Sequence, residues 1–274
     1  MAPPLIKLCQ STLKEHHSDW EIVLLDQNTV WDWSERPAVS RVRFDQLPLA
    51  HQSDLIRNQL LIQYGGVWSD PTIYYTDSLN TWLDEALRSD VFYFSRPGPD
   101  RLIANWFIAA GEKANPLLVC LQDALCKFWN GFDYSNIGSS SNPIIGLLER
   151  VFKKNSYLPT LWLNPIFKSI TGQVPYLVYH YLFTHLVRNN SDFRELWDEM
   201  VKISADGPHK LQRLGLLCTA EKPMLRIVES EQPPLFKLNW KLNFDELTDD
   251  MLIVKLFERS HQRHLLSGST IRTA

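Results

Sequence analysis

The chain has 274 residues, with 28 Lys and Arg against 31 Asp and Glu, a formal net charge of −3, and 45% hydrophobic residues. This balance is typical of a soluble globular protein with a sizeable core, and the lack of a basic stripe argues against a nucleic-acid partner. No apolar run is long enough to span a membrane, no signal-peptide pattern is visible, and the four scattered cysteines predict reduced thiols. We therefore expect a cytoplasmic protein, with peripheral association at the inner membrane face left open.

The predicted elements alternate between helix and strand through the first 110 residues and are mainly helical afterwards. In chain order, helices are expected over residues 3–16, 51–64, 79–88, 115–129, 144–153, 176–188, 191–202 and 244–258. Strands are expected over residues 21–25, 67–69, 91–94, 104–110 and 235–242, the first of them a buried parallel strand. Mixed or Gly/Ser-rich loops are expected over residues 29–48 and 135–142. The sequence therefore predicts an α/β fold in one domain, with a core in residues 1–110 and a helical part in residues 111–274.

The segment from Ser53 to Thr72 contains the residues that suggest chemistry. On the predicted helix, Asp54 and Arg57 are three residues apart and share one face with Asn58. Apolar side chains occupy the other faces, so the helix should be buried and its charged pair should need partners. Chemistry alone favours a structural ion pair; the alternative is a polar pocket that binds sugar hydroxyls.

Asp70 follows the short predicted strand over residues 67–69. In α/β sheets, ligands bind beyond the carboxyl ends of strands. An Asp at such a place can hold a ribose hydroxyl or a divalent cation, and Mg²⁺ and Mn²⁺ take oxygen ligands. Pro71 stiffens the turn, and Thr72 offers a second oxygen. Alternatively, Asp70 caps the following turn.

The same segment resembles the signature of the capsular polysaccharide synthesis protein family and its relatives in glycosyltransferase family 32. That signature is Ser-Asp-x-x-Arg, then Leu, then Tyr-Gly-Gly-x-Trp/Tyr, then Asp-x-Asp or Asp-x-Thr. The matching residues are Ser53, Asp54, Arg57, Leu61, Tyr64, Gly65, Gly66, Trp68, Asp70 and Thr72. The glucosylating bacterial toxins share this layout more distantly. The resemblance covers about residues 3–215.

The resemblance implies a GT-A fold, with a Rossmann-type core that binds a nucleotide sugar. It implies retaining transfer of a hexose from a nucleoside-diphosphate sugar, most simply a UDP-hexose, to a glycan or glycolipid acceptor, assisted by Mn²⁺ or Mg²⁺. The implied catalytic residues are Asp70, Asp54 and Arg57. The implied donor-binding residues are Asp54, Arg57, Asn58, Gly65, Gly66 and Asn105. The implied metal ligands are Asp70, Thr72 and His209. The alternatives are a surface loop position for His209 and a satisfied buried amide for Asn105.

Two departures from the family pattern bear on this reading. The family begins with a strand that ends before the position of Pro4, and we expect that strand to be truncated or replaced here. Thr72 stands where a second metal carboxylate is common, and a neutral hydroxyl is the weaker cation ligand. The alternative function is therefore a catalytically impaired relative that binds carbohydrate or acts as a scaffold.

Overall fold

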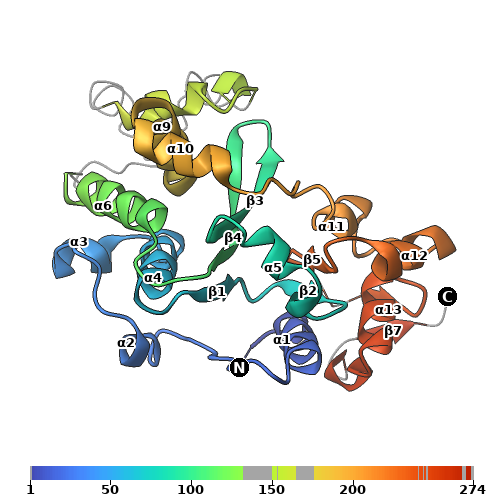
Figure 1. Ribbon diagram of the computed structural model, residues 1–274. Coiled ribbons are helices and arrows are strands. Elements are labelled where there is room, and N and C mark those ends of the chain that lie inside the picture. Colours follow the sequence, from blue (N-terminus) through green and yellow to red (C-terminus); the bar gives the residue numbers. More distant parts are fainter. Residues whose placement is uncertain are drawn as a thin grey trace. The chain divides into compact units, whose positions relative to one another are not determined.

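The computed structural model of the protein describes residues 2–131, 150–152, 154–164, 176–239, 241, 242, 244, 246–266 and 270–272. The chain divides into two compact units, and most of their helices and strands are labelled in Figure 1. The two-segment unit comprises residues 25–68 and 85–204. The three-segment unit comprises residues 1–24, 69–84 and 205–274. The expectation of one domain over residues 1–274 stays a prediction.

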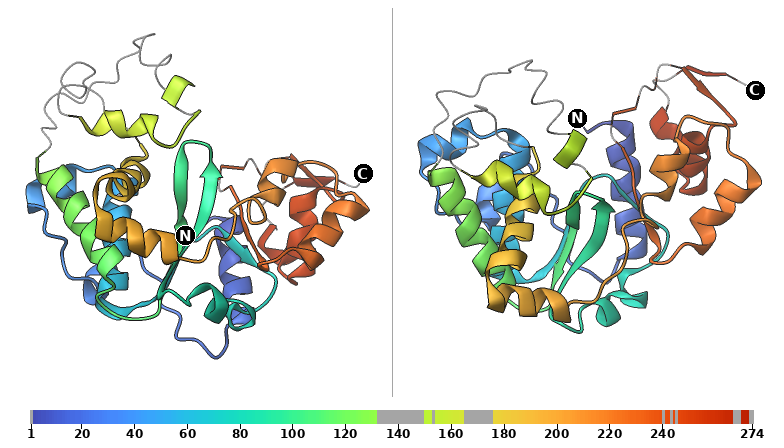
Figure 2. Two further views of the ribbon diagram at one scale, coloured as in Figure 1. Left: turned by 45° about the horizontal axis from the view of Figure 1, so that its top comes forward. Right: turned by 90° about the horizontal axis from the view of Figure 1, so that it is seen from above.

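The two-segment unit contains a three-stranded sheet with the order β1-β4-β3, from β1 (Gly66–Ser69), β3 (Val91–Gly98) and β4 (Arg101–Ala110). β3 and β4 are antiparallel, with Val91 opposite Ala110. Its helices are α2 (Val30–Trp33), α3 (Arg41–Gln46), α4 (Leu49–Tyr64), α6 (Pro116–Asn130), the 3₁₀ helix η3 (Leu158–Leu163), α9 (Val178–Asn189) and α10 (Ser191–Glu199). Helix α9 packs against β4, α6 and α10 (Figure 2). The core of this unit therefore lies between the sheet and these helices.

Local sequence signals explain the helix α6. The Asn115 side chain accepts hydrogen bonds from the backbone N–H groups of Leu117 and Leu118, and Pro116 occupies the first helical position. Asn is a strong N-cap, and a proline at this position has no N–H to leave unsatisfied. Leu117, Leu118 and Leu121 are fully buried, so the apolar face of α6 forms part of the core.

The three-segment unit is built from elements far apart in the sequence. β2 (Ile73–Tyr75) pairs antiparallel with β5 (Leu235–Lys237), placing Ile73 opposite Lys237. β6 (Glu246–Thr248) and β7 (Thr270–Arg272) form a parallel pair. Its helices are α1 (Pro4–His16), η1 (Leu79–Thr81), α11 (Lys210–Leu214), α12 (Lys222–Ser230), α13 (Leu252–Arg259) and η4 (Arg263–Leu266). A second hydrophobic core, which includes Leu5, Tyr74 and Phe236, holds these segments together.

The prediction of a buried parallel strand over Glu21–Leu25 is wrong. Residues 21–26 form neither helix nor strand, and Val23 and Leu24 are 37% and 46% exposed. Within the described residues no strand pairs with this segment. An extended segment cannot be buried without partners for its backbone N–H and C=O groups, so the apolar run stays at the surface.

Other boundaries differ where distant contacts decide the structure. The helix predicted over residues 79–88 is broken at Trp82 into η1 and α5 (Leu83–Ala86). The strand predicted over 235–242 ends at Lys237, and the helix predicted over 244–258 is preceded by β6 and begins only at Leu252. The loop predicted over 135–142 and most of the helix predicted over 144–153 lie outside the described residues.

The predicted α/β class is confirmed, as a mixed fold of many helices with small, mainly antiparallel sheets. The helices predicted over residues 3–16, 51–64 and 115–129, and the strands over 67–69, 91–94 and 104–110, are present within a few residues. The Rossmann-type GT-A core stays a prediction. Across the part of the chain that the structure covers, no helix has both the length and the apolar character needed to cross a membrane.

Candidate functional site

The motif helix α4 buries Asp54 and Arg57 against β4, and each residue is 6% exposed. Oδ1 of Asp54 lies 3.4 Å from Nη2 of Arg57 and accepts a hydrogen bond from Nδ2 of Asn105 at 2.8 Å. Arg57 also donates from Nε and Nη2 to the carbonyl and hydroxyl of Ser53, and from Nη1 to the carbonyl of Asn105. The guanidinium lies 5.2 Å from the ring centroid of Trp68. The structure therefore brings Asp54, Arg57 and Asn105 together in one buried polar cluster.

His51 belongs to the same cluster, and the sequence analysis did not single it out. Its Nδ1 lies 3.7 Å from Oδ2 of Asp54, and this nitrogen has no hydrogen-bond partner among the described residues. The spacing of three residues between His51 and Asp54 on the predicted helix is the signal that would have identified it. The positive charge of Arg57 also acts on His180. Burial lowers the pKa of His180 well below its ordinary value, and the charges of Arg101 and Arg57 lower it further.

Asn58, predicted to bind the donor, is fully buried inside the same unit. Its Nδ2 donates to the carbonyl of Leu118 at 2.8 Å and to Gln122 at 3.2 Å, while its Oδ1 accepts from the hydroxyl of Tyr179 at 3.2 Å. Tyr179 in turn shares a 2.9 Å hydrogen bond with Tyr93. Since its oxygen and nitrogen are both satisfied by the protein, this geometry favours a packing role for Asn58, and donor binding stays a prediction.

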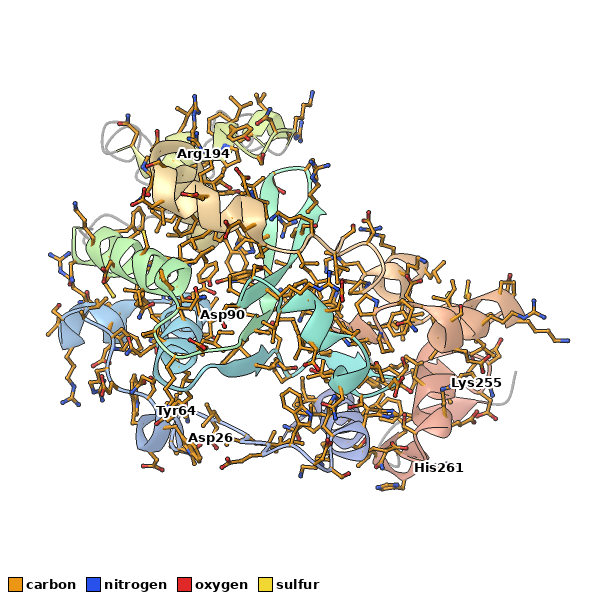
Figure 3. All side chains as sticks on the ribbon, in the orientation of Figure 1. Asp26, Tyr64, Asp90, Arg194, Lys255 and His261 are labelled. Atoms are coloured by element: carbon orange, nitrogen blue, oxygen red, sulfur yellow. The ribbon has the colours of Figure 1, made fainter. Side chains whose placement is uncertain are left out.

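Gly65 and Gly66 form the turn between α4 and β1, which follows Tyr64 (labelled in Figure 3). Gly65 has φ +68° and ψ −149°, and its N–H closes the helix by donating to the carbonyl of Leu61. A Cβ on Gly65 would lie 3.2 Å from the carbonyl oxygen of Ala110. Gly66 has φ +77°, with nothing within 4 Å of an added Cβ. The positive φ of both residues, and the close approach of backbone at Gly65, therefore favour glycine within the fold itself, and their contact with a donor stays a prediction.

Asp70 and Thr72 lie in the three-segment unit, where they meet Lys237 of β5. Oδ2 of Asp70 is 3.3 Å from Nζ of Lys237, and that ammonium also donates to Oγ1 of Thr72. The side chains of Asp70 and Lys237 are 22% and 18% exposed, whereas Thr72 is buried at 2%. Unlike the cluster around Arg57, this arrangement leaves an ammonium and a carboxylate partly exposed beside a buried hydroxyl.

His209 stands in the same unit, at the start of α11 and partly buried. The carbonyl of the preceding residue, Pro208, accepts a 2.9 Å hydrogen bond from the backbone N–H of Lys237. The chain at His209 therefore runs beside β5, on which Lys237 lies. Its assignment as a metal ligand stays a prediction.

The residues predicted to hold Mn²⁺ or Mg²⁺ do not fit a divalent cation in this arrangement. The ammonium of Lys237 interacts with both oxygen donors, Asp70 and Thr72, so a metal ion there would lie against a fixed positive charge. Mg²⁺ requires near-octahedral oxygen coordination, usually including carboxylates and substrate phosphates. Among the described residues, no group of three or more His, Cys, Asp or Glu side chains is placed to hold a metal.

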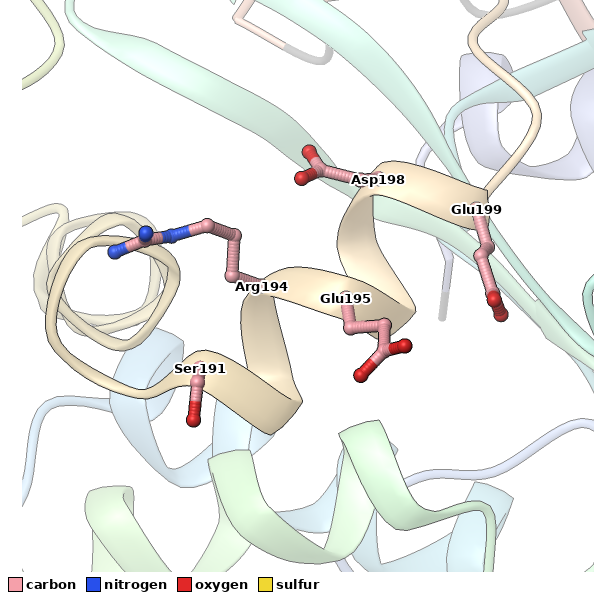
Figure 4. Close-up of a pocket in the computed structure, with 5 residues that line it drawn as sticks. All are labelled: Ser191, Arg194, Glu195, Asp198 and Glu199. Carbon is pink, nitrogen blue, oxygen red and sulfur yellow. The ribbon is translucent and has the colours of Figure 1, made fainter.

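A hollow of about 490 Å³ lies beside α10, away from these residues in the sequence. It is lined by Ser191, Arg194, Glu195, Asp198 and Glu199, all from that helix and all exposed (Figure 4). Arg194 is already engaged, donating from Nε to the carbonyl of Val187 at 2.7 Å. No predicted site residue lines this hollow, and all five of its lining residues are exposed, so it does not enter the candidate site.

The sequence of residues 1–136 matches the capsular polysaccharide synthesis protein family. This match contains all of the motif from Ser53 to Thr72, and with it α4, β1 and the Asp70 turn. No curated protein and no solved structure matches the chain. Of the predicted site residues, only His209 lies outside the family segment.

Lys237 also lies outside the family segment, and the sequence analysis did not identify it. The strand predicted over residues 235–242 contains it, but nothing local indicates which strand is its neighbour. Lys237 is 165 residues from Thr72, and only the pairing of β5 with β2 brings the two together. A partly apolar predicted strand that carries two lysines, Lys237 and Lys241, is therefore the sequence signal for this residue.

Proposed function

We propose that this protein transfers a hexose from a nucleoside-diphosphate sugar, most simply a UDP-hexose, to a glycan or glycolipid acceptor during capsular polysaccharide synthesis. The family match supports the biosynthetic process. The observation that carries the enzymatic assignment is the partly exposed pair of Asp70 and Lys237, which lies beside the buried hydroxyl of Thr72, with Asp70 directly after β1. It combines a hydroxyl-binding carboxylate with a phosphate-binding ammonium, the two chemistries that a nucleotide sugar requires.

In the proposed reaction, the bond between the anomeric carbon and the diphosphate oxygen breaks, and a bond to the acceptor oxygen forms. The leaving diphosphate gains negative charge in the transition state, and fixed positive charge that faces it lowers the barrier. A leaving diphosphate oxygen takes the acceptor proton, so the reaction as proposed needs no dedicated general base. The carboxylate of Asp70 accepts a hydrogen bond from a donor hydroxyl and thereby orients the nucleotide sugar.

The buried cluster around Arg57 has a supporting role in this proposal. Asp54 and Arg57 connect α4 to the Asn105 region of β4 through direct hydrogen bonds, and both are nearly inaccessible. They fix the helix that leads into the Gly65-Gly66 turn and so into β1. We therefore propose that their effect on the donor acts through the position of that turn.

The test is release of the nucleoside diphosphate from UDP-glucose, UDP-galactose, UDP-N-acetylglucosamine and GDP-mannose by the whole chain, with and without capsular oligosaccharide acceptors. We expect turnover with one or a few donors, and a loss of roughly 10²-fold in rate in Asp70→Asn, because the nucleotide sugar is then misplaced. Asp77→Asn is the matched control, because Asp77 is an exposed carboxylate of the same unit. Binding of a sugar without turnover of any donor would instead identify a carbohydrate-binding or scaffold protein.

Nuclear magnetic resonance of the product then determines the stereochemistry. We propose retention, so that an α-linked donor gives an α-linked product. An inverted anomeric configuration in the first product formed would contradict this part of the proposal and would leave sugar transfer itself intact.

A further inference from the structure

We propose that the ammonium of Lys237 takes the place of a divalent cation in this protein and binds the diphosphate of the donor directly. This rests on the proposed function for the identity of the ligand, and it deepens that function by naming the group that recognises the phosphates. The position between Asp70 and Thr72 is already held by a positive charge of the protein, the ammonium of Lys237.

Backbone hydrogen bonds hold the strand that carries Lys237 on both of its sides. Ile73 of β2 pairs with Lys237 of β5, and next to this pair the carbonyl of Thr72 accepts a hydrogen bond from the N–H of Leu238 at 2.9 Å. The N–H of Lys237 donates to the carbonyl of Pro208. Strand pairing on one side and the Pro208 segment on the other hold the Cα of Lys237. The contacts of the ammonium with Asp70 and Thr72 hold the end of its side chain, and positive charge held in place is what electrostatic stabilisation of a leaving group requires.

The ammonium retains capacity for a further acceptor. It has three N–H donors and no acceptor. The hydroxyl of Thr72 and the carboxylate of Asp70 account for two of them. The side chain of Lys237 is 18% exposed, and the proposal places a phosphate oxygen on the third N–H, approaching from solvent. Lysine is a compact point charge that binds phosphate in many proteins, and it does so without a metal.

Inorganic pyrophosphate is the probe that isolates this role, because it carries the two phosphates without ribose or sugar. We expect the whole chain to bind pyrophosphate in the presence of a chelator, with no tightening by Mn²⁺, as measured by calorimetry. Lys237→Met should weaken this binding roughly ten- to a hundredfold, the usual effect of losing a charged hydrogen bond. Lys222→Met is the matched control, because Lys222 is an exposed lysine of the same unit.

Asp70→Asn distinguishes a phosphate site made by Lys237 from one made by a metal ion, because its effect on pyrophosphate binding differs between the two. If Lys237 binds the phosphates, removing the neighbouring negative charge leaves pyrophosphate binding intact or tightens it. If a metal held by Asp70 binds them, the same substitution abolishes Mn²⁺-dependent binding. Should Lys237→Met fail to fold, Lys237→Gln keeps an N–H donor for Thr72 while removing the charge, and the same weakening is expected.

Binding that requires Mn²⁺, binding that is unchanged in Lys237→Met and Lys237→Gln, or no pyrophosphate binding at all would overturn the inference. Turnover of a nucleotide sugar that requires Mn²⁺ and persists in Lys237→Met would overturn it while leaving the proposed function standing. Lys237-dependent pyrophosphate binding without turnover of any nucleotide sugar would support the inference and contradict the proposed function.

Discussion

Asn105 of β4 donates a hydrogen bond from Nδ2 to Oδ1 of Asp54 on α4, at 2.8 Å. The same carboxylate oxygen faces Arg57, whose guanidinium returns to the carbonyl of Asn105. Three residues of the predicted donor site thus form a closed set of contacts between a helix and a strand. This relationship decides what substitutions at Arg57 should do.

Arg57→Ala should lower the free energy of unfolding by about 3–5 kcal/mol, because it leaves the buried carboxylate of Asp54 without its cation. Urea denaturation measures this. Arg88→Ala is the control: Arg88 pairs with Glu85 at the same spacing of three residues, but the two side chains are 69% and 62% exposed. An exposed pair contributes about 0–1 kcal/mol. Equal, small shifts in the two variants would show that Arg57 has no structural role.

Gly65→Ala should destabilise the protein more than Gly66→Ala. Both residues have positive φ, which strains an alanine, but only at Gly65 would the new Cβ lie 3.2–3.3 Å from backbone atoms of Ala110 and Glu112. Strain at such a φ/ψ costs about 1–3 kcal/mol, and the overpacking at Gly65 adds to it. Denaturation midpoints of the two variants give the comparison. A larger loss in Gly66→Ala would mean that the turn has a different conformation.

His17 should make the three-segment unit less stable in acid. Its Nδ1 lies 2.8 Å from the carbonyl of Leu13, and its Nε2 accepts the N–H of Leu79 at 2.9 Å. Burial lowers the pKa of His17 below 6.5, and its hydrogen bond to Leu13 offsets this only in part. The unfolded chain therefore binds a proton near pH 6.5 that the folded protein accepts only at lower pH. Stability should consequently fall as the pH drops below about 6.5.

His17→Leu tests this dependence. Removing the acceptor of the Leu79 N–H should cost about 1–3 kcal/mol at neutral pH and should flatten the decline of the unfolding free energy in acid. His16→Leu is the control, since His16 is the adjacent histidine and makes no contact of this kind in the described chain. His180, whose pKa is also lowered, contributes to the acid decline equally in both variants. An unchanged acid slope in His17→Leu would contradict the assignment.

Cys9 and Cys126 should resist alkylation in the folded protein. Burial raises the pKa of Cys9 to about 12 and that of Cys126 to about 11, so at mildly alkaline pH both are thiols, whereas the thiolate is the reactive form. Cys218, which is only partly buried, serves as the internal reference. Iodoacetamide labelling followed by mass spectrometry should modify Cys218 first and the two buried cysteines only after denaturation. Early labelling of Cys9 would contradict the packing of α1.

The sequence was informative where local chemistry decides the structure. The helices predicted over residues 51–64 and 115–129 are present within a few residues, and in the structure Gly65 ends α4 while Asn115 caps the start of α6. By contrast, the apolar run at Glu21–Leu25 reads as a strand, and whether it becomes one depends on a partner that the sequence does not specify. The contact between Lys237 and Thr72 could not be predicted for the same reason, because it depends on the pairing of strands whose residues are 165 positions apart. Residue types and their spacing therefore identified the buried motif and Asp70, and missed the cation that faces Asp70.

The pairing of β2 with β5 also sets an order of events during synthesis. Chains fold from the N-terminus as they are made, and contacts between distant residues form slowly. The two-segment unit has all its residues once the chain reaches position 204, whereas β2 has no partner until residues 235–237 have been made. Asp70 and Thr72 consequently meet Lys237 only after most of the polypeptide exists. A chain that stops before β5 can complete its larger unit and still lack the accessible ammonium, so a nascent or interrupted product carries the family motif without the phosphate-binding group we propose.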